Sequence, residues 1–220
     1  MKSAVTRRTL VAGLPLLIAG CAVSKGAPSA IFEPVIVPSK AASLSGPITN
    51  EPFVIAALNL DRIDQELLRR DVSYSGPYPP GSLIVNIAER RLYLVRPGGS
   101  AIRYAVGVGR EEALNFQGSA IIGRKAAWPK WTPTQSMMSS IPRYQAYADG
   151  MPGGIDNPLG ARALYIFRDN QDTHFRVHGT NAPRSIGKSV SSGCIRLFNR
   201  DIIDLYDRVP AGAPIVVLEG

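Results

Sequence analysis

From residue 81 onward, the apolar residues of the chain fall into short runs that are separated by turn residues. The runs are rich in Val, Ile, Leu and Tyr, which are residues that strands favour. The first three runs follow one another closely and predict a meander. The predicted strands are 82–87, 92–95, 101–108, 163–167, 175–178 and 214–218. We therefore expect a mainly β fold.

Two stretches have helical spacing instead. Between residues 60 and 70, the apolar positions 60, 63, 67 and 68 predict a short amphipathic helix. A second short helix is predicted at 201–208. Residues 128–160 contain many Pro and Gly residues and are expected to form a long loop between two strands.

The first residues have the features of an export signal. A positively charged start is followed at 10–18 by an apolar run that is too short to span a bilayer. The run leads into Ile-Ala-Gly-Cys, which resembles the bacterial lipobox, and the arginine pair at 7 and 8 weakly resembles a twin-arginine signal. The sequence therefore predicts a signal peptide at 1–21 and an exported, periplasmic protein anchored to a membrane by lipid on Cys21.

Composition divides the remainder of the chain into three parts. Residues 22–52 are rich in Ala, Ser, Pro and Gly and are expected to form an extended tether. Residues 53–80 are expected to form a short strand and helix extension that braces the domain after it. The strands of residues 81–220 are expected to form that single domain.

The charge argues against one class of partner. The formal net charge of +8 falls to +5 without the first 20 residues, which hold three basic and no acidic side chains. The basic residues are scattered, so nucleic acid is not an expected partner. An acidic polymer or a carboxylate-bearing substrate fits this charge, as does a plain solvated surface. No glycine-rich phosphate loop links a strand to a helix, so no nucleotide cofactor is expected.

The candidate chemistry lies near the C-terminus, where a histidine and a cysteine stand 16 positions apart at His178 and Cys194. A cysteine attacks as a thiolate, and a nearby imidazole is a common means of producing it. A lone cysteine is more often a small buried residue. Here, however, Ser191, Ser192 and Gly193 precede it, which predicts an irregular turn whose backbone N–H groups could form an oxyanion hole.

Two other uses of these residues are less well supported. His174 and His178 would share a face of a strand, but residues four apart on a strand are about 13 Å apart, too far for one metal ion. We therefore expect no metal. A disulfide would need Cys21, which the lipobox reserves for lipid or removal, so Cys194 is expected to be a free thiol.

The segment resembles the signature of L,D-transpeptidases, the YkuD-type domain. The residues that carry the resemblance are His178-Gly179-Thr180-Asn181, Ser185-Ile186-Gly187 and Ser191-x-Gly193-Cys194-Ile195-Arg196-Leu197. Further similarity lies in Gly107-Val108-Gly109, in Trp-Pro-x-Trp-Thr-Pro at 128–133 and in Asn157-Pro158-Leu159-Gly160. The resemblance implies a β-sandwich or barrel-like domain with short helices that acts on peptidoglycan stem peptides.

The resemblance also implies roles for individual residues. Cys194 would attack the bond between the third residue and the terminal D-Ala of a tetrapeptide, leaving a thioester, and His178 would hold the thiolate and shuttle the proton. The backbone of Ser192 and Gly193 would hold the oxyanion. Arg196 would either clamp a substrate carboxylate or order its loop through backbone carbonyls. The remaining residues of the motif would bind substrate: Gly179, Thr180 and Ser191.

Two departures from the family pattern bear on this assignment. Ser192 stands where most relatives have a second histidine, and 115–119 replace the usual Thr-Pro-x-Gly stretch. The same thioester could also be resolved by water, which would make the protein an L,D-carboxypeptidase or an amidase. A third possibility is a non-catalytic, wall-binding lipoprotein that keeps the fold.

Overall fold

A computed structural model describes residues 46–218. This region contains eleven strands, two α-helices and five short 3-10 helices. The strands are β1 (Arg70–Ser73), β2 (Leu83–Asn86), β3 (Arg91–Arg96), β4 (Ser100–Ala105), β5 (Val108–Gly109), β6 (Gly118–Ala127), β7 (Arg162–Arg168), β8 (Gln171–His178), β9 (Ser189–Ser191), β10 (Ile195–Arg196) and β11 (Pro214–Leu218). The helices are α2 (Gln135–Ser140) and α3 (Asn199–Arg208), and the 3-10 helices are η1 (Leu60–Arg62), η2 (Gln65–Leu67), η3 (Glu112–Leu114), η4 (Pro142–Tyr147) and η5 (Pro183–Ser185).

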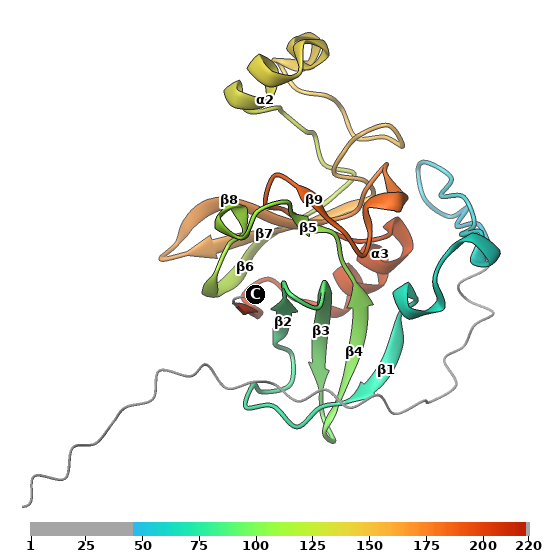
Figure 1. The fold of residues 1–220 in the computed structure, drawn as a ribbon, viewed down its shortest axis with the longest axis vertical. Helices are drawn as coiled ribbons and strands as arrows, with labels where there is room; N and C mark the ends of the chain where they lie inside the picture. The colour runs from blue at the N-terminus through green and yellow to red at the C-terminus, as the bar shows by residue number, and fades with distance from the viewer. Residues whose placement is uncertain (1–45, 219–220) are drawn as a thin grey trace, which may run out of the picture.

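Nine strands form one sheet in the order β1-β4-β3-β2-β11-β6-β7-β8-β10, and β5 pairs with β9 in a small second sheet. The pairs β11–β2 and β8–β10 are parallel, whereas the other pairs of the large sheet are antiparallel. Figure 1 shows that the sheet curls, so that the half containing β1–β4 and the half containing β6–β8 face one another. The mainly β, sandwich-like fold with short helices is therefore confirmed.

The main core fills the inside of this curl. Each central strand contributes alternate residues, as a strand with one buried face must. The fully buried members include Leu83 of β2, Ile122 of β6, Leu164 of β7 and Ile202 of α3. Because β8 and β10 also contribute Val177 and Ile195, the segments that carry His178 and Cys194 are fixed to the most buried part of the molecule.

A strand is present at each predicted place, but the one predicted at 101–108 is divided into β4, which ends at Ala105, and β5, which begins at Val108. The longest strand was not predicted. Strand β6 lies between β11 and β7 and has only one fully buried side chain, Ile122. This agrees with its sequence, GSAIIGRKAA, which lacks the regular alternation of apolar and polar residues and so gave no strand prediction. Backbone pairing on both sides, rather than side-chain pattern, makes this segment a strand.

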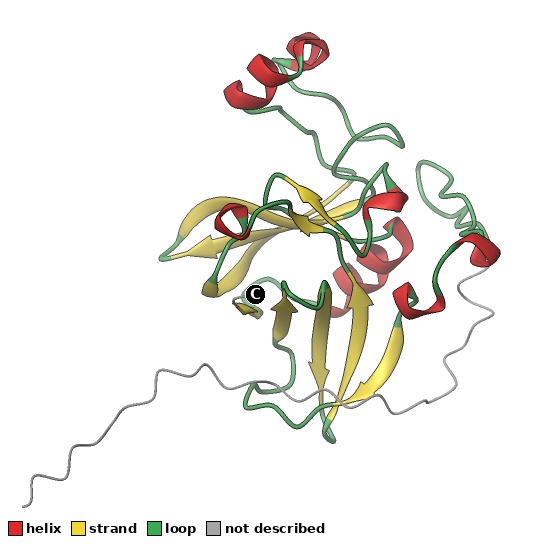
Figure 2. Cartoon of the chain, in the orientation of Figure 1, coloured by secondary structure: helices red, strands yellow, loops and turns green. Residues whose placement is uncertain are grey.

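The stretch that was expected to be a loop contains two short helices. Residues 128–160 leave the ends of β6 and β7 and form the arm at the top of Figure 2, which carries α2 and η4. An isolated bridge between Trp131 and Met151 holds the two sides of the arm together. Thr134 caps α2, because its hydroxyl accepts a hydrogen bond from the N–H of Met137 at 3.2 Å.

The amphipathic helix expected between residues 60 and 70 is not formed. The segment makes two 3-10 turns, η1 and η2, and the residues that follow them, Ile63 and Leu68, are extended. Ile63 and Leu67 nevertheless pack against the buried Phe198. The apolar spacing was therefore a signal of packing onto the domain and not of a continuous helix.

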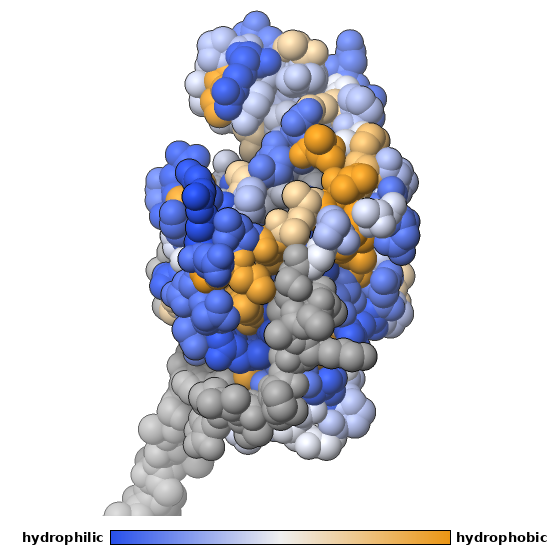
Figure 3. Space-filling view, turned by 90° about the vertical axis from the view of Figure 1, so that its right-hand side faces the viewer, coloured by the Kyte–Doolittle hydropathy of each residue, from blue (hydrophilic) through white to orange (hydrophobic). Residues whose placement is uncertain are grey.

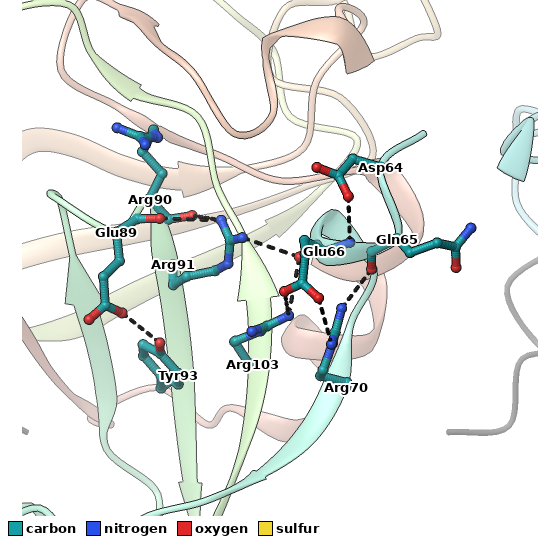
Figure 4. Close-up of polar contacts among 9 residues, drawn as sticks. All are labelled: Asp64, Gln65, Glu66, Arg70, Glu89, Arg90, Arg91, Tyr93 and Arg103. Carbon is teal, nitrogen blue, oxygen red and sulfur yellow. Dashed lines mark hydrogen bonds and ion pairs between the residues drawn. The ribbon is translucent and has the colours of Figure 1, made fainter. Parts of the chain in front are cut away.

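Arginines of the meander hold the second of these turns in place. Figure 4 shows Glu66 of η2 between Arg70 and Arg103, which lie on β1 and β4. Arg91 of β3 and Arg103 both donate to the backbone carbonyl of Glu66, at 3.2 and 3.1 Å. The extension thus contacts three strands of the sheet through one residue.

Ordered contacts begin before residue 53. Glu51 accepts hydrogen bonds from Trp128 Nε1 at 2.8 Å and from Arg162 Nη1 at 2.9 Å, and Phe53 packs edge-on against the Trp128 ring. These contacts join the extension to both ends of the 128–160 arm. Figure 3 shows apolar side chains gathered on the face that lies at the right-hand side of Figure 1. Val54 and Ile155 are among the exposed apolar residues of the protein.

Two expectations concern the N-terminal region. The predicted signal peptide, with Cys21, and most of the predicted tether lie outside the described residues. Within residues 46–218, none of the helices has the length and apolar character needed to cross a bilayer.

Candidate active site

The predicted turn before Cys194 is present between β9 and β10. The hydroxyl of Ser191 closes it by donating to the carbonyl of Cys194 at 2.8 Å and accepting from the N–H of Gly193 at 3.0 Å. Cys194 is a half-buried free thiol. Ser191, which the family resemblance assigned to substrate binding, is itself buried and shapes the turn that presents the cysteine.

Glycine is required at position 193 for two reasons. Its φ of +118° is a conformation that residues with a side chain rarely adopt. A Cβ at this position would also lie 2.1 Å from the carbonyl oxygen of Leu114, which belongs to the backbone of a neighbouring loop. Because backbone cannot move aside as a flexible side chain can, the loop around η3 allows only glycine before the cysteine.

We expect Gly193→Ala to lower the free energy of unfolding by about 2 kcal/mol or more, from the unfavourable φ together with the contact. Gly212→Ala is the matched control, because Gly212 also has a positive φ (+88°) but open space around it. It should cost only about 1 kcal/mol. Chemical denaturation measures both, and equal losses would show that the contact with Leu114 is unimportant.

His178 ends β8 beside the cysteine. In the parallel pairing of β8 with β10, His178 is opposite Arg196 and Val177 is opposite Ile195. Cys194 directly precedes β10, and the backbone N–H of Arg176 hydrogen-bonds to its thiol. Neighbouring strands lie about 4.8 Å apart. The structure thus places the two residues that the sequence pointed to on adjacent, paired segments, at the end of β8 and directly before β10.

The imidazole is held in one orientation. His178 is 4% exposed, and its Nδ1 lies 2.6 Å from the carbonyl oxygen of Gly179. A carbonyl oxygen can only accept, so in the neutral ring Nδ1 carries the hydrogen and Nε2 holds the lone pair. The backbone of Leu159 also hydrogen-bonds to the ring, so backbone groups of two segments fix its position.

Both groups of the pair are neutral in the resting protein. Burial, followed by the positive charge of Arg196, lowers the pKa of His178 to about 3. Burial also raises the pKa of the Cys194 thiol, and this outweighs the opposing effects of the Arg176 N–H and of the charges of Arg176 and Arg196. A resting thiolate, as the imidazole alone suggested, is therefore not expected; the site contains a thiol beside a neutral base.

The pH dependence of alkylation tests this state. Because only the thiolate reacts, the rate with iodoacetamide should be low at pH 7 and should rise with pH, with an apparent pKa above the 9.0 of an ordinary cysteine. Peptide mapping by mass spectrometry would confirm that Cys194 is the residue modified. A rate that is already constant between pH 6 and 8 would contradict the neutral pair and indicate a thiolate.

Arg196 is half-buried and faces both members of the pair. Its charge acts on the imidazole of His178 and on the thiol of Cys194. Its backbone exchanges two hydrogen bonds with Gly107, but within residues 46–218 its side chain forms no hydrogen bond to a backbone carbonyl. Of its two expected roles, the ordering of the loop by the guanidinium is therefore not seen.

A residue that sequence reasoning missed fixes the backbone around His178. The side-chain oxygen of Asn199, the first residue of α3, accepts from the N–H groups of Ala161 and Thr180 at 3.0 and 3.1 Å. A Cβ on Gly179 would lie 2.2 Å from this oxygen. Gly179 and the buried Thr180, both assigned to substrate binding by resemblance, thus help to seat the histidine. Asn199 directly follows the Cys194 motif, but only its contacts across the fold show its role.

The two histidines do not lie on one regular strand face. His174 has a φ of +63° and is exposed, in a part of β8 whose register against β7 is shifted. The extra residues interrupt the alternation on which a shared face depends. No group of three or more His, Cys, Asp or Glu residues suitable for a metal ion occurs in the described part of the chain.

The fold and the site define a mainly β domain with a cysteine and a histidine at the edge of a curled sheet. The family model of the YkuD L,D-transpeptidase catalytic domain matches residues 80–217, and the chain therefore belongs to this family.

Known proteins are similar over the same region. The probable L,D-transpeptidase ErfK/SrfK of Escherichia coli K12 is 36% identical over 162 residues, which are 71% of this chain and 48% of that protein. The chain spans about half the length of this relative and of the probable L,D-transpeptidase YbiS of the same organism.

Solved structures are also similar. A Brucella melitensis protein described as a probable carnitine operon oxidoreductase caia is 45% identical, covering 73% of this chain and 99% of that one, with a TM-score of 0.49. The Ldtfm–avibactam carbamoyl enzyme is 15% identical, covering 65% of this chain and 50% of that one; its TM-score of 0.50 supports the fold alone.

Proposed function

We propose that this protein is an L,D-transpeptidase that acts on peptidoglycan tetrapeptide stems through a thioester on Cys194. The observation that carries the proposal is the placement of the Cys194 thiol on a glycine-dependent turn, beside a buried imidazole that is neutral and oriented. A neutral base next to a thiol is what proton removal during attack requires. Membership of the L,D-transpeptidase family supports the choice of substrate.

The reaction has two acyl-transfer steps. Cys194 Sγ attacks the carbonyl carbon before the terminal D-Ala while its proton passes to Nε2 of His178. The tetrahedral intermediate collapses as the same proton moves to the D-Ala amine, which leaves, and the carbonyl remains bonded to sulfur as a thioester. An acceptor amine then attacks the thioester and gives a proton to Nε2 of His178. As the peptide bond forms and the carbon–sulfur bond breaks, that proton passes to the leaving sulfur, which restores the Cys194 thiol and the neutral imidazole.

The oxyanion of each intermediate needs hydrogen-bond donors near Cys194. The Gly193 N–H was a candidate, but it is occupied by the Ser191 hydroxyl at 3.0 Å. The N–H groups of Ser192 and Cys194 form no hydrogen bond within residues 46–218. We therefore assign the oxyanion to these two groups, with the charge of Arg196 close by. The pair expected from the family resemblance, Ser192 and Gly193, and the pair assigned here both use the backbone N–H at position 192. A serine at this position can therefore serve as well as a histidine.

The proposed location follows from the N-terminal sequence. The signal peptide at 1–21 would direct export, and lipid on Cys21 would anchor the protein to a membrane facing the periplasm. Residues 22–52 would then act as the tether, and its last residues already contact the domain, because the Gly46 carbonyl accepts a hydrogen bond from Arg200 and Glu51 binds Arg162 and Trp128.

The products identify the reaction. The protein is incubated with disaccharide-tetrapeptide and analysed by mass spectrometry, both as intact protein and as released peptide. We expect an acyl-enzyme mass on the peptide that contains Cys194, and crosslinked dimers that lack one D-Ala. Tripeptide alone would show that water is the acceptor and that the protein is a carboxypeptidase. Unchanged substrate and unmodified, folded protein would contradict catalysis and favour a wall-binding role.

A further inference from the structure

The outer face of the sheet carries a row of side chains that leads to the cysteine. Arg124 of β6, Tyr165 of β7 and Arg176 of β8 are opposite one another in the sheet register. The Arg124 guanidinium carbon lies 3.5 Å from the centroid of the Tyr165 ring, and that of Arg176 lies 4.3 Å from it. The thiol of Cys194 comes next, because it is hydrogen-bonded to the Arg176 N–H.

These residues point away from the main core. Their neighbours along the same strands, Leu164 and Val177, belong to that core, and strand residues alternate between faces. Tyr165 is nonetheless only 5% exposed, although it lies on the outer face. The guanidinium groups of Arg124 and Arg176 both stack on the Tyr165 ring, and these cation–π contacts hold both side chains in fixed positions.

The two arginines differ in how their charge is balanced. Arg176 donates to both carboxylate oxygens of Asp172, at 2.7 and 3.0 Å, so its fork is occupied. Arg124 is exposed, and within residues 46–218 it forms no ion pair or hydrogen bond. Its contact with Tyr165 uses the flat face of the guanidinium and leaves the N–H groups at its edge free to bind a carboxylate.

We propose that Arg124 is a specificity-determining residue that binds a free carboxylate of the peptide substrate, on the side of Cys194 toward β6. The inference rests on the proposed function for the identity of the substrate. Three strand spacings, about 14 Å of sheet, separate β6 from β10. An arginine side chain folded back over Tyr165 of β7 shortens this to two spacings, about 10 Å or three residues of extended peptide. The part of the stem that becomes the acyl group has two carboxylates within such a distance, one on glutamate and one on diaminopimelate, and Arg124 would bind one of these two. The third carboxylate of the tetrapeptide, on the departing D-Ala, lies on the other side of the attacked bond.

Binding is measured in a Cys194→Ala background, so that no substrate is consumed. The probes are disaccharide-tetrapeptides with both carboxylates free, with the glutamate carboxylate amidated, or with the diaminopimelate carboxylate amidated. Calorimetric titration compares Arg124, Arg124→Gln and Arg124→Lys. Arg62→Gln is the matched control, since Arg62 is also exposed and without an ion pair within residues 46–218 but lies in η1.

We expect Arg124→Gln to weaken binding of the free peptide about tenfold, as loss of a charge-assisted hydrogen bond does. Arg124→Lys should have a smaller effect, and Arg62→Gln less than twofold. Amidation of the carboxylate that Arg124 binds should weaken binding to the protein that retains Arg124 by the same factor of about ten. With that amidated peptide, Arg124→Gln should have no further effect. This comparison also decides between the two carboxylates.

Three results would overturn the inference: equal binding by Arg124→Gln, equal weakening for all three peptides, or no measurable binding by the Arg124 protein. Equal weakening would mean that Arg124 binds neither the glutamate nor the diaminopimelate carboxylate. The outcome is independent of the product assay. If the unsubstituted protein forms crosslinks but Arg124→Gln and amidation do not show these linked losses of binding, only the inference is rejected. If the linked losses are seen but no product forms, the inference is retained and the proposed function is rejected.

Discussion

Replacing Cys194 by alanine is expected to abolish both the acyl-enzyme mass and every product of the tetrapeptide. The thioester cannot form without Sγ, and within residues 46–218 Cys194 is the only cysteine. Loss of a nucleophile removes the reaction path itself, so activity should fall to the background without protein. The side chain is small and half-buried, and the free energy of unfolding should change by only about 1 kcal/mol.

The control for this variant is Ser192→Ala in the same turn. Ser192 is exposed, and its proposed contribution is its backbone N–H, which alanine keeps. We expect its rate of product formation to stay within about threefold of the unsubstituted protein, a change below 1 kcal/mol. Product formation by folded Cys194→Ala would refute the thioester mechanism, and a large loss in Ser192→Ala would give the hydroxyl a role that the structure does not show.

Replacing His178 by alanine should lower kcat about 10²- to 10⁴-fold, the usual contribution of a general base. Without Nε2, the thiol proton has no acceptor, and burial opposes the formation of a free thiolate. His174→Ala is the matched control, because it removes the other histidine of the chain, which is exposed and has a positive φ. It should leave kcat within about twofold, a change in activation free energy of a fraction of about 1 kcal/mol. Circular dichroism of both variants separates loss of the base from loss of the fold.

The pH profile gives an independent check on His178. Its pKa is lowered to about 3, so the imidazole is already deprotonated well below neutral pH. We therefore expect no loss of kcat from this group between pH 7 and pH 5, where an ordinary histidine with a pKa of 6.5 would become protonated. An acid limb with an apparent pKa near 6.5 that disappears in the His178→Ala variant would show that the imidazole is not desolvated as the structure has it.

Local pattern was sufficient where a segment buries most of its own apolar residues. Strands β2, β3 and β7 are buried on both faces and stand out as short apolar runs, whereas β11 buries alternate residues and α3 buries residues at helical spacing. These segments could therefore be predicted without knowledge of their partners. The pattern failed in β6, which is stabilised by pairing on both edges. It also failed around η1 and η2, where the apolar residues at helical spacing include Ile63 and Leu67, which pack against the buried cluster that contains Phe198. Both failures concern segments whose conformation depends on distant residues.

The same distinction applies to the site. The candidate groups could be identified from sequence alone, because Cys194, its glycine turn and His178 lie in one short segment with a recognisable motif. Their state depends on the folded chain. Burial makes both groups neutral, Leu114 makes glycine obligatory at 193, and Asn199 fixes the backbone at Thr180. The row from Arg124 to Cys194 likewise exists only in the folded sheet. Desolvation and cross-strand register are properties of segments brought together from far apart in the chain, and no local pattern contains them.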